Sequence, residues 1–157
     1  MNSSLVRSTR LKNLDSPILY VEISLFVHAT EDPEKCIKAI SAIFPSIFEY
    51  DITFTKDSAE GHYDNPIIIL KTIVRHPITE ALIQNLSKKL ESDDKKKLLT
   101  EIETHINDKN VLYLRFDKQE AYLGNLKIGQ SDPVHVKIKL QGQVLDINGV
   151  SQLLSLL

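Results

Sequence analysis

The sequence contains a single cysteine, Cys36, no tryptophan and only five glycines among its 157 residues. One cysteine cannot close an internal disulfide or build a multi-cysteine metal site. Each glycine stands alone, so the chain has no glycine-rich loop of the kind that binds phosphate. These absences exclude disulfide-stabilised small domains and P-loop nucleotide binding, and the scarcity of cysteine favours the cytoplasm.

Long apolar runs and an excess of charge of either sign are also missing. No stretch approaches the roughly 20 apolar residues of a membrane span, and residues 1–12 lack the apolar centre of a signal peptide. Lysine and arginine number 19 against 21 acidic residues, which gives a net charge of −2. We therefore expect no membrane partner, and any nucleic-acid site must come from how charge is distributed rather than from its total.

The apolar periodicity predicts one α+β domain. Period-two alternation indicates strands over Ile18–His28, Ile47–Lys56, Pro66–Arg75, Val111–Phe116 and Val134–Leu140. Helical patterns indicate helices after Pro33, over Pro77–Leu90 and over Ser92–Ile106, and Asp117 can cap one further short turn. Because only one parallel crossover is evident, we expect a mixed five-stranded sheet with helices mainly on one face.

The two ends of the chain differ from this domain, which we place at residues 17–141. Residues 1–16 are polar and predict a flexible arm. Residues 142–157 predict a helical extension, since Ile147, Val150, Leu153 and Leu154 fall near one side of a helix. This extension can cover its own domain or pair with a second copy, and we expect a homodimer through residues 144–157.

The segment Leu112–Gly124 is the most informative stretch. Its strand half alternates, with three apolar side chains on one face and Tyr113 and Arg115 on the other. A helical turn follows, and Gly124 can end it in the left-handed conformation. This arrangement is expected to gather Tyr113, Arg115, Lys118, Gln119 and Tyr122 at one strand-to-helix corner. A packed core needs only the apolar half, so the polar half suggests a bound polyanion.

The outward side of the predicted sheet carries cations among aromatic rings. The fifth strand contributes His135, Lys137 and Lys139, and the other strands contribute Tyr113, Arg115, Lys71, Arg75, Tyr20, Phe26 and His28. If these faces coincide, the surface can stack bases and pair with phosphates. The alternative is an ordinary solvated face, on which lysines at an edge deter aggregation.

The loop Gly61–Pro66 places four polar or aromatic side chains side by side. His62 and Tyr63 can stack on unpaired bases, and we assign them to the RNA-binding set. For Asp64 and Asn65 we prefer a turn in which these side chains bond their own backbone.

Three blocks of sequence, Phe26–Lys35, Gly61–Pro66 and Leu112–Gly124, carry a resemblance. In this order they resemble an archaeal family described as RNA-binding and as a predicted exosome subunit, over roughly residues 17–140. The resemblance implies a fold similar to that of the ribosomal protein that binds the small RNA of the central protuberance. It also implies RNA as a ligand and exosome or other RNA-processing proteins as partners.

Catalysis and metal binding have little support. His28-Ala-Thr30 matches half of the paired His-x-Thr signature of phosphoesterases, but no other histidine repeats it. Such chemistry needs one acid and one base. No spacing of histidine, cysteine or carboxylate fits a metal site, so we expect neither a metal nor a cofactor.

We therefore expect a non-catalytic RNA-binding accessory protein in RNA processing or degradation. The first alternative is a protein-interaction module of an RNA-processing complex with little RNA contact. The second and weaker alternative is an RNA-end phosphoesterase that uses His28.

Overall fold

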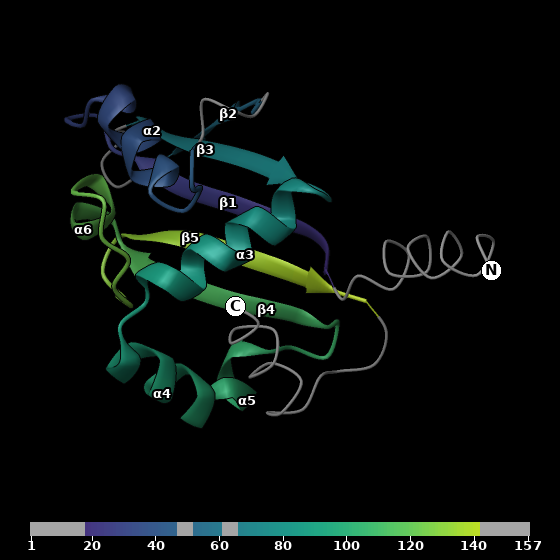
Figure 1. The fold of residues 1–157 in the computed structure, drawn as a ribbon. Coiled ribbons are helices and arrows are strands. Elements are labelled where there is room, and N and C mark those ends of the chain that lie inside the picture. The colour runs from purple at the N-terminus through teal and green to yellow at the C-terminus, as the bar shows by residue number, and fades with distance from the viewer. Residues whose placement is uncertain (1–17, 47–51, 61–65, 142–157) are drawn as a thin grey trace.

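The computed structural model describes residues 18–46, 52–60 and 66–141, and it forms one sheet covered by helices (Figure 1). The elements are β1 (Ile18–Val27), α2 (Pro33–Ser41), β2 (Thr55–Glu60), β3 (Pro66–Val74), α3 (Ile78–Lys89), α4 (Ser92–Thr100), α5 (Ile102–His105), β4 (Val111–Asp117), α6 (Lys118–Tyr122) and β5 (Pro133–Leu140). The sheet order is β2-β3-β1-β5-β4. The predicted single α+β domain with five strands is confirmed.

Every strand pairing in this sheet is antiparallel, so the prediction of a mixed sheet is wrong. The crossover through α2 does return the chain in the same direction, because β1 and β2 both run antiparallel to β3. However, β3 lies between β1 and β2 and separates them. A parallel crossover in the sequence therefore leaves no parallel pair in the sheet.

Strand β1 explains how the sheet acquires one dry face. Val21, Ile23, Leu25 and Val27 are all buried, as period two requires. Leu19 is in phase with these four residues but is 44% exposed, while Ile18 is buried. The register of β1 against β5 shifts between Ile18 and Tyr20, and this irregularity turns the first side chains over.

Helices α2 and α3 pack on the dry face, in front of the sheet in Figure 1. The carboxylate of Asp32 accepts from the Glu34 N–H at 3.0 Å, and Pro33 occupies the first helical turn, as the sequence indicated. Both helices turn aliphatic side chains, among them Ile40, Leu82 and Leu86, into the core. No helix of the described residues is long and apolar enough to cross a membrane.

Two predicted elements change. The helix predicted over Ser92–Ile106 is divided at Glu101 into α4 and α5. The strand predicted over Ile47–Lys56 is wrong at 52–54, where the chain is irregular, and residues 47–51 lie outside the described residues. Strand β2 begins only at Thr55, because its pairing with β3 runs from Thr55 opposite Lys71 to Glu60 opposite Pro66.

The two terminal predictions fall outside the described residues. Both the arm at 1–16 and the helical extension at 142–157, with its homodimer contact, remain predictions.

Candidate nucleic-acid interface

The side of the sheet away from α2 and α3 forms a surface that we call the open face. It consists of Tyr20, Glu22, Ser24 and Phe26 of β1, Lys71, Ile73 and the adjoining Arg75 of β3, Tyr113 and Arg115 of β4, and His135, Lys137 and Lys139 of β5. All of these side chains are exposed or half-buried, whereas their immediate neighbours along each strand are mostly buried. The predicted coincidence of the cationic and aromatic faces is therefore present.

The strand register arranges this face in rows. Lys137 of β5 lies opposite Glu22 of β1 on one side and Tyr113 of β4 on the other. One row along, His135 lies between Ser24 and Arg115. Adjacent strands are about 4.8 Å apart, and rows of the same face about 6.6–6.8 Å apart. Side chains from β1, β5 and β4 thus form one continuous platform.

Cations and rings alternate across this platform. The Nζ of Lys137 lies 5.7 Å from the ring centroid of Tyr113, and the Arg75 guanidinium carbon lies 6.0 Å from that of Tyr20. Such distances allow a cation to be attracted to the ring quadrupole. The rings of Phe26 and His135 meet edge to face, with centroids 6.1 Å apart. Each aromatic side chain therefore has a polar or cationic neighbour.

One carboxylate interrupts the positive character of the open face. Glu22 lies 3.7 Å from the Lys71 Nζ and 3.5 Å from the Lys137 Nζ. Glu22 belongs to the outward set of β1, and the pattern of cations and rings in the sequence does not reveal its role. Glu22 reduces the charge that two lysines can offer to a ligand.

Two further cations of the platform, Arg115 of β4 and Lys139 of β5, are held differently. Arg115 is exposed, and its guanidinium donates to the Gln130 side-chain carbonyl at 3.3 Å. Lys139 donates to the backbone carbonyl of Lys109. Neither cation contacts a carboxylate within 4 Å among the described residues. Both charges therefore remain available to an anionic ligand.

His135 is an uncharged member of the platform near neutral pH. Burial lowers the pKa of its imidazole from the usual 6.5, and the positive charges of Arg115 and Lys137 lower the pKa further. A neutral imidazole can both stack and share a hydrogen bond. If phosphate groups neutralised the charges of Arg115 and Lys137, the pKa of His135 would rise.

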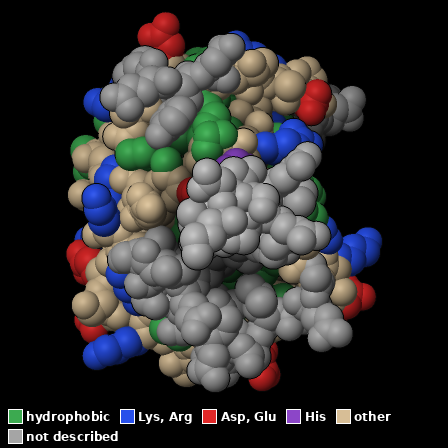
Figure 2. Space-filling model, turned by 45° about the vertical axis from the view of Figure 1, so that its right-hand side comes forward, with side chains coloured by type: hydrophobic (Ala, Val, Ile, Leu, Met, Phe, Trp, Pro, Cys, Tyr) green, Lys and Arg blue, Asp and Glu red, His purple; other side chains and the backbone are tan. Residues whose placement is uncertain are grey.

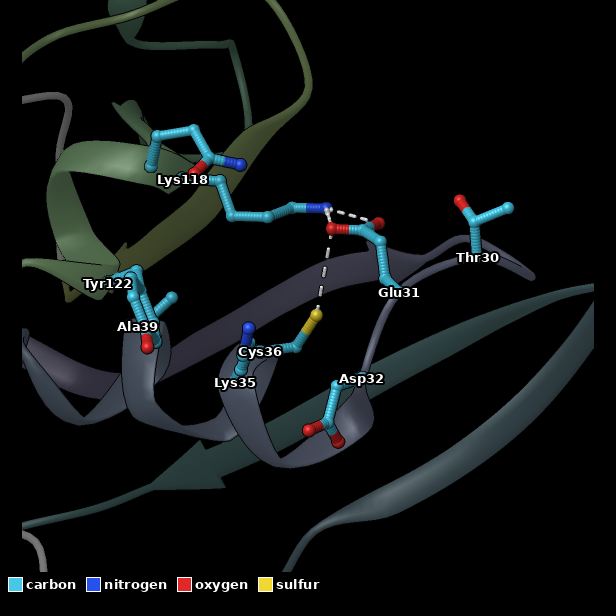
Figure 3. Close-up of a pocket in the computed structure, with 9 residues that line it drawn as sticks. Thr30, Glu31, Asp32, Lys35, Cys36, Ala39, Lys118 and Tyr122 are labelled. Carbon is cyan, nitrogen blue, oxygen red and sulfur yellow. Dashed lines mark hydrogen bonds and ion pairs between the residues drawn. The ribbon is translucent and has the colours of Figure 1, made fainter.

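The predicted corner of five residues is not one site. Tyr113 and Arg115 face outward from β4, but Lys118 is only 5% exposed, so the prediction that it joins them at one corner is wrong. Its Nζ lies 3.0 Å from Glu31 (Figure 3). The same Nζ lies 2.8 Å from Asp132 and donates to the Phe26 carbonyl at 2.8 Å. Those two carboxylates already satisfy its charge.

The pKa values around Lys118 agree with this structural role. Burial by itself would lower the pKa of Lys118, but hydrogen bonds and charges from Asp132 and Glu31 outweigh burial and raise it. Burial likewise would raise the pKa of Asp132, but Lys118 and His28 hold it below the usual 3.8. The ammonium of Lys118 and the carboxylate of Asp132 therefore stay ionised near neutral pH.

Gln119 and Tyr122 lie away from the open face. Together with Thr30, Lys35, Cys36 and other residues of the α2 end, they line a pocket of about 320 Å³ (Figure 3). Buried Cys36 has a raised pKa, because burial and the charge of Glu31 both disfavour its thiolate. The α6 helix thus directs these two predicted site residues toward α2 instead of toward β5.

His28, Glu31 and Asp132 are the described residues that best resemble a metal-binding group. Their donor atoms lie within 4.8 Å of one another. The Lys118 ammonium occupies this cluster, with contacts to both carboxylates. Because a cation of the chain itself neutralises the carboxylates, these residues do not fit a metal ion.

His62 and Tyr63 lie outside the described residues, so their predicted stacking on RNA remains a prediction. On the described surface visible in Figure 2, lysine and arginine side chains alternate with carboxylates. Charges of both signs are therefore interspersed over the described part of this view, which agrees with the near balance of 19 basic and 21 acidic residues.

Comparison with known proteins agrees with the resemblance noted in the sequence. A family model described as RNA binding matches residues 20–140. The chain is 36% identical over 124 residues to RNA-binding protein PAB1135 of Pyrococcus abyssi, covering 77% of this chain and 80% of that protein.

Solved structures show the same fold. Protein AF2318 from Archaeglobus fulgidus is 33% identical, with a TM-score of 0.72, and the match covers 85% of this chain and 94% of that one. Protein SSO0741 from Sulfolobus solfataricus is 27% identical, with a TM-score of 0.71, and the match covers 88% and 99%. With a family model that spans most of its length, the chain belongs to this RNA-binding family.

Proposed function

We propose that the open face is the RNA-binding surface and that the protein acts as a non-catalytic accessory factor in RNA processing or degradation. The observation that carries this proposal is the alternation of cations and aromatic rings across three paired strands, as in Lys137 against Tyr113. Rings can stack on exposed bases, while neighbouring cations pair with the backbone phosphates. Family membership supports RNA as the ligand.

The form of the surface favours unpaired RNA over a regular duplex. Bases inside a duplex are already stacked, so aromatic side chains gain only where bases are free. Ile73, which is 45% exposed on β3, and Phe26 add apolar area that a base can cover. We therefore expect tighter binding to single-stranded segments or loops, with His62 and Tyr63 contributing further rings.

Exosome association, action in the cytoplasm and a homodimer through residues 144–157 are further parts of this proposal. The first rests on the family resemblance and the last on the apolar pattern of the segment. Light scattering of the full chain and of a chain that ends at Gln141 tests the dimer. A full-length monomer at high concentration would refute it.

We do not assign phosphoesterase activity to His28. Its Nε2 lies 3.1 Å from Asp132, but a second histidine is needed for acid–base chemistry. His135 pairs with Ser24 of β1, whereas His28 directly follows the end of β1, four residues and about 13 Å further along the chain. Turnover of an RNA with a cyclic-phosphate end would overturn this reading.

The test is a fluorescence-anisotropy titration of labelled single-stranded RNA and of a duplex of the same sequence, at several salt concentrations. Replacing Arg75 and Arg115 with alanine should weaken single-strand binding and reduce the salt slope by roughly one unit for each lost contact. Both side chains are exposed, so the fold should persist.

The matched control is the pair Lys96 and Lys97, which are exposed on α4 and carry the same total charge. Replacing them with alanine should leave the affinity nearly unchanged. Equal losses in both double variants would mean that RNA senses net charge only, and the open face would then not be the site.

A further inference from the structure

A second surface lies on the helix side of the molecule, between α2, α6 and the end of α3. We call it the α2–α6 groove. It has a volume of about 580 Å³, and the residues that matter here are Lys38, Phe44, Pro45, Lys89, Tyr122 and Leu123. These residues come from the helix-covered side of the sheet, so a ligand in this groove would not compete for the open face.

The groove is electropositive. Its lining contains two lysines and no aspartate or glutamate. Lys38 lies 4.8 Å from the ring centroid of Tyr122, and Lys35 approaches the same ring at 5.9 Å. Neither lysine lies within 4 Å of a carboxylate in the described part of the chain. Of these two lysines, Lys38 lines the groove, and it has no partner of opposite sign there among the described residues.

Lys89 closes the other side of the groove. Its Nζ donates to the Ala42 carbonyl at 2.8 Å, near the end of α2. Burial lowers the pKa of Lys89, since the ammonium is partly removed from water. A carboxylate bound beside it would gain a charge-assisted hydrogen bond in a partly desolvated place.

The groove also has an apolar side. Leu123 is 69% exposed, more than the other large exposed hydrophobic side chains in the described ranges. Gly124, with φ of 91°, follows it and ends the turn, so that Leu123 is held at the rim. Phe44 and Pro45 also line the groove. Leu123, Phe44 and Pro45 together give the groove an apolar side that a partner's apolar side chain can contact.

We propose that the α2–α6 groove docks an acidic segment of a partner protein, with carboxylates on Lys38 and Lys89 and an apolar side chain against Leu123. A protein segment fits this groove better than RNA. The apolar lining offers a hydrophobic side chain a contact that a phosphate backbone cannot use.

This site does not depend on the open face binding RNA. If both operate, the protein joins an acidic protein partner to an RNA from opposite sides of one sheet. The protein would then act as an adaptor, whose two ligands bind at the same time.

The experiment uses the ¹⁵N-labelled full chain and a synthetic peptide with two glutamates on each side of a Leu-Leu pair. Amide resonances near Ala42, Phe44 and Leu123 should shift on addition of the peptide, while those of β4 and β5 should not. A peptide with glutamine in place of every glutamate should bind about fivefold more weakly. The expected loss is modest because exposed charge pairs each contribute little.

Two substitutions test the charged and the apolar side of the groove separately, at Lys38 and at Leu123. Lys38→Glu should abolish the shifts, whereas the matched Lys96→Glu on α4 should retain them. Leu123→Ser should weaken binding without loss of fold, because the side chain is exposed. RNA affinity should be unchanged in all three.

Three results would overturn the proposal: equal binding of the glutamine peptide, peptide shifts outside the groove, or RNA shifting the groove resonances in place of the peptide. None of these depends on whether RNA binds the open face. A failed open-face titration with intact peptide binding would refute the proposed function alone.

Discussion

On the open face, Lys137 lies beside the ring of Tyr113, and at the α6 corner Lys118 lies between Asp132 and Glu31. Lys137 lies within β5 and Lys118 directly follows β4, so both belong to the same pair of strands. The open-face lysine is 43% exposed at its side chain, and the corner lysine 6%. The groups that contact a lysine therefore determine whether its charge is available to a ligand or stabilises the fold.

The largest effect should come from Lys118→Met, which removes the ammonium and leaves two carboxylates close together. We expect a loss of about 3 kcal/mol in the free energy of unfolding, the lower end for breaking a buried pair, because Asp132 is 40% exposed. Denaturation by urea measures this loss. RNA affinity of the folded protein should be unchanged.

The pH dependence of stability sharpens this prediction. The pKa of Asp132 is lowered in the fold, so its contribution is present above the unfolded value of 3.8 and is lost as pH falls through the folded value. In Lys118→Met, the free energy of unfolding should therefore fall less steeply as pH decreases through this acidic range. If Lys118→Met were as stable as the wild type and lost stability equally at acidic pH, the charges of this corner would not stabilise the fold. Lys96→Met on exposed α4 is the control.

The next largest expected effect is a difference in RNA-binding free energy between variants of Tyr113 and Tyr122. Tyr113→Leu should cost about 1–3 kcal/mol of binding free energy to single-stranded RNA, the usual value of one base–ring stack. Tyr122→Leu should cost nothing, since Tyr122 faces α2.

Tyr113→Phe keeps the ring and loses only the hydroxyl that accepts from Asn107 at 3.1 Å, so it should bind RNA almost normally. Anisotropy titrations measure all three variants. If Tyr122→Leu weakened binding as much as Tyr113→Leu, the distinction between the two regions would fail.

A smaller and opposite effect is expected for Glu22→Gln. Removing this carboxylate frees Lys71 and Lys137, so RNA should bind more tightly and with a salt slope steeper by about one unit. Glu80→Gln on α3, where Glu80 pairs with His76, changes the net charge equally and should have little effect. An unchanged slope in Glu22→Gln would separate these lysines from the phosphate contacts.

The smallest effect concerns His135. Burial and two neighbouring cations lower its pKa below 6.5 in the free protein. Phosphates that neutralise those cations would raise it, so binding takes up a proton and affinity should increase modestly as pH falls from about 7.5 to 6. His135→Gln should remove the increase, and NMR titration of the imidazole follows the pKa directly.

The same lowered pKa affects stability with a definite sign. The neutral imidazole is favoured in the fold, so its contribution is complete above 6.5 and declines as pH falls toward the folded value. Acid therefore slightly weakens the fold while it strengthens RNA binding. Opposite slopes in the two measurements would support a ligand near His135.

Local patterns predicted most of the architecture. Strong alternation in β1, β4 and β5 identified both faces of these strands, because a period of two fixes which side chains are buried. Strand β2 was misplaced, since its residues Thr55–Glu60 are polar and resemble a loop. An edge strand with a solvated face has no apolar pattern to reveal it.

The positions of the site residues were predictable where neighbours in sequence determine the geometry. The prediction failed where distant contacts determine it. The row containing Tyr113 and Lys137 follows from phase within each strand. The fate of Lys118 depends on Glu31, which is 87 residues away in the chain, and no local pattern records that contact. The same holds for Tyr122, whose lysine neighbours lie on α2.

Photo-crosslinking of wild-type protein to single-stranded RNA, followed by tryptic digestion and mass spectrometry, tests the central claim most directly. Cleavage after Lys109, Arg115, Lys118 and Lys127 separates the two tyrosines, with Tyr113 in peptide 110–115 and Tyr122 in peptide 119–127. We expect RNA adducts on peptide 110–115 and not on 119–127. Adducts on 119–127 without adducts on 110–115 would place RNA at the α6 corner and contradict the assignment of the open face.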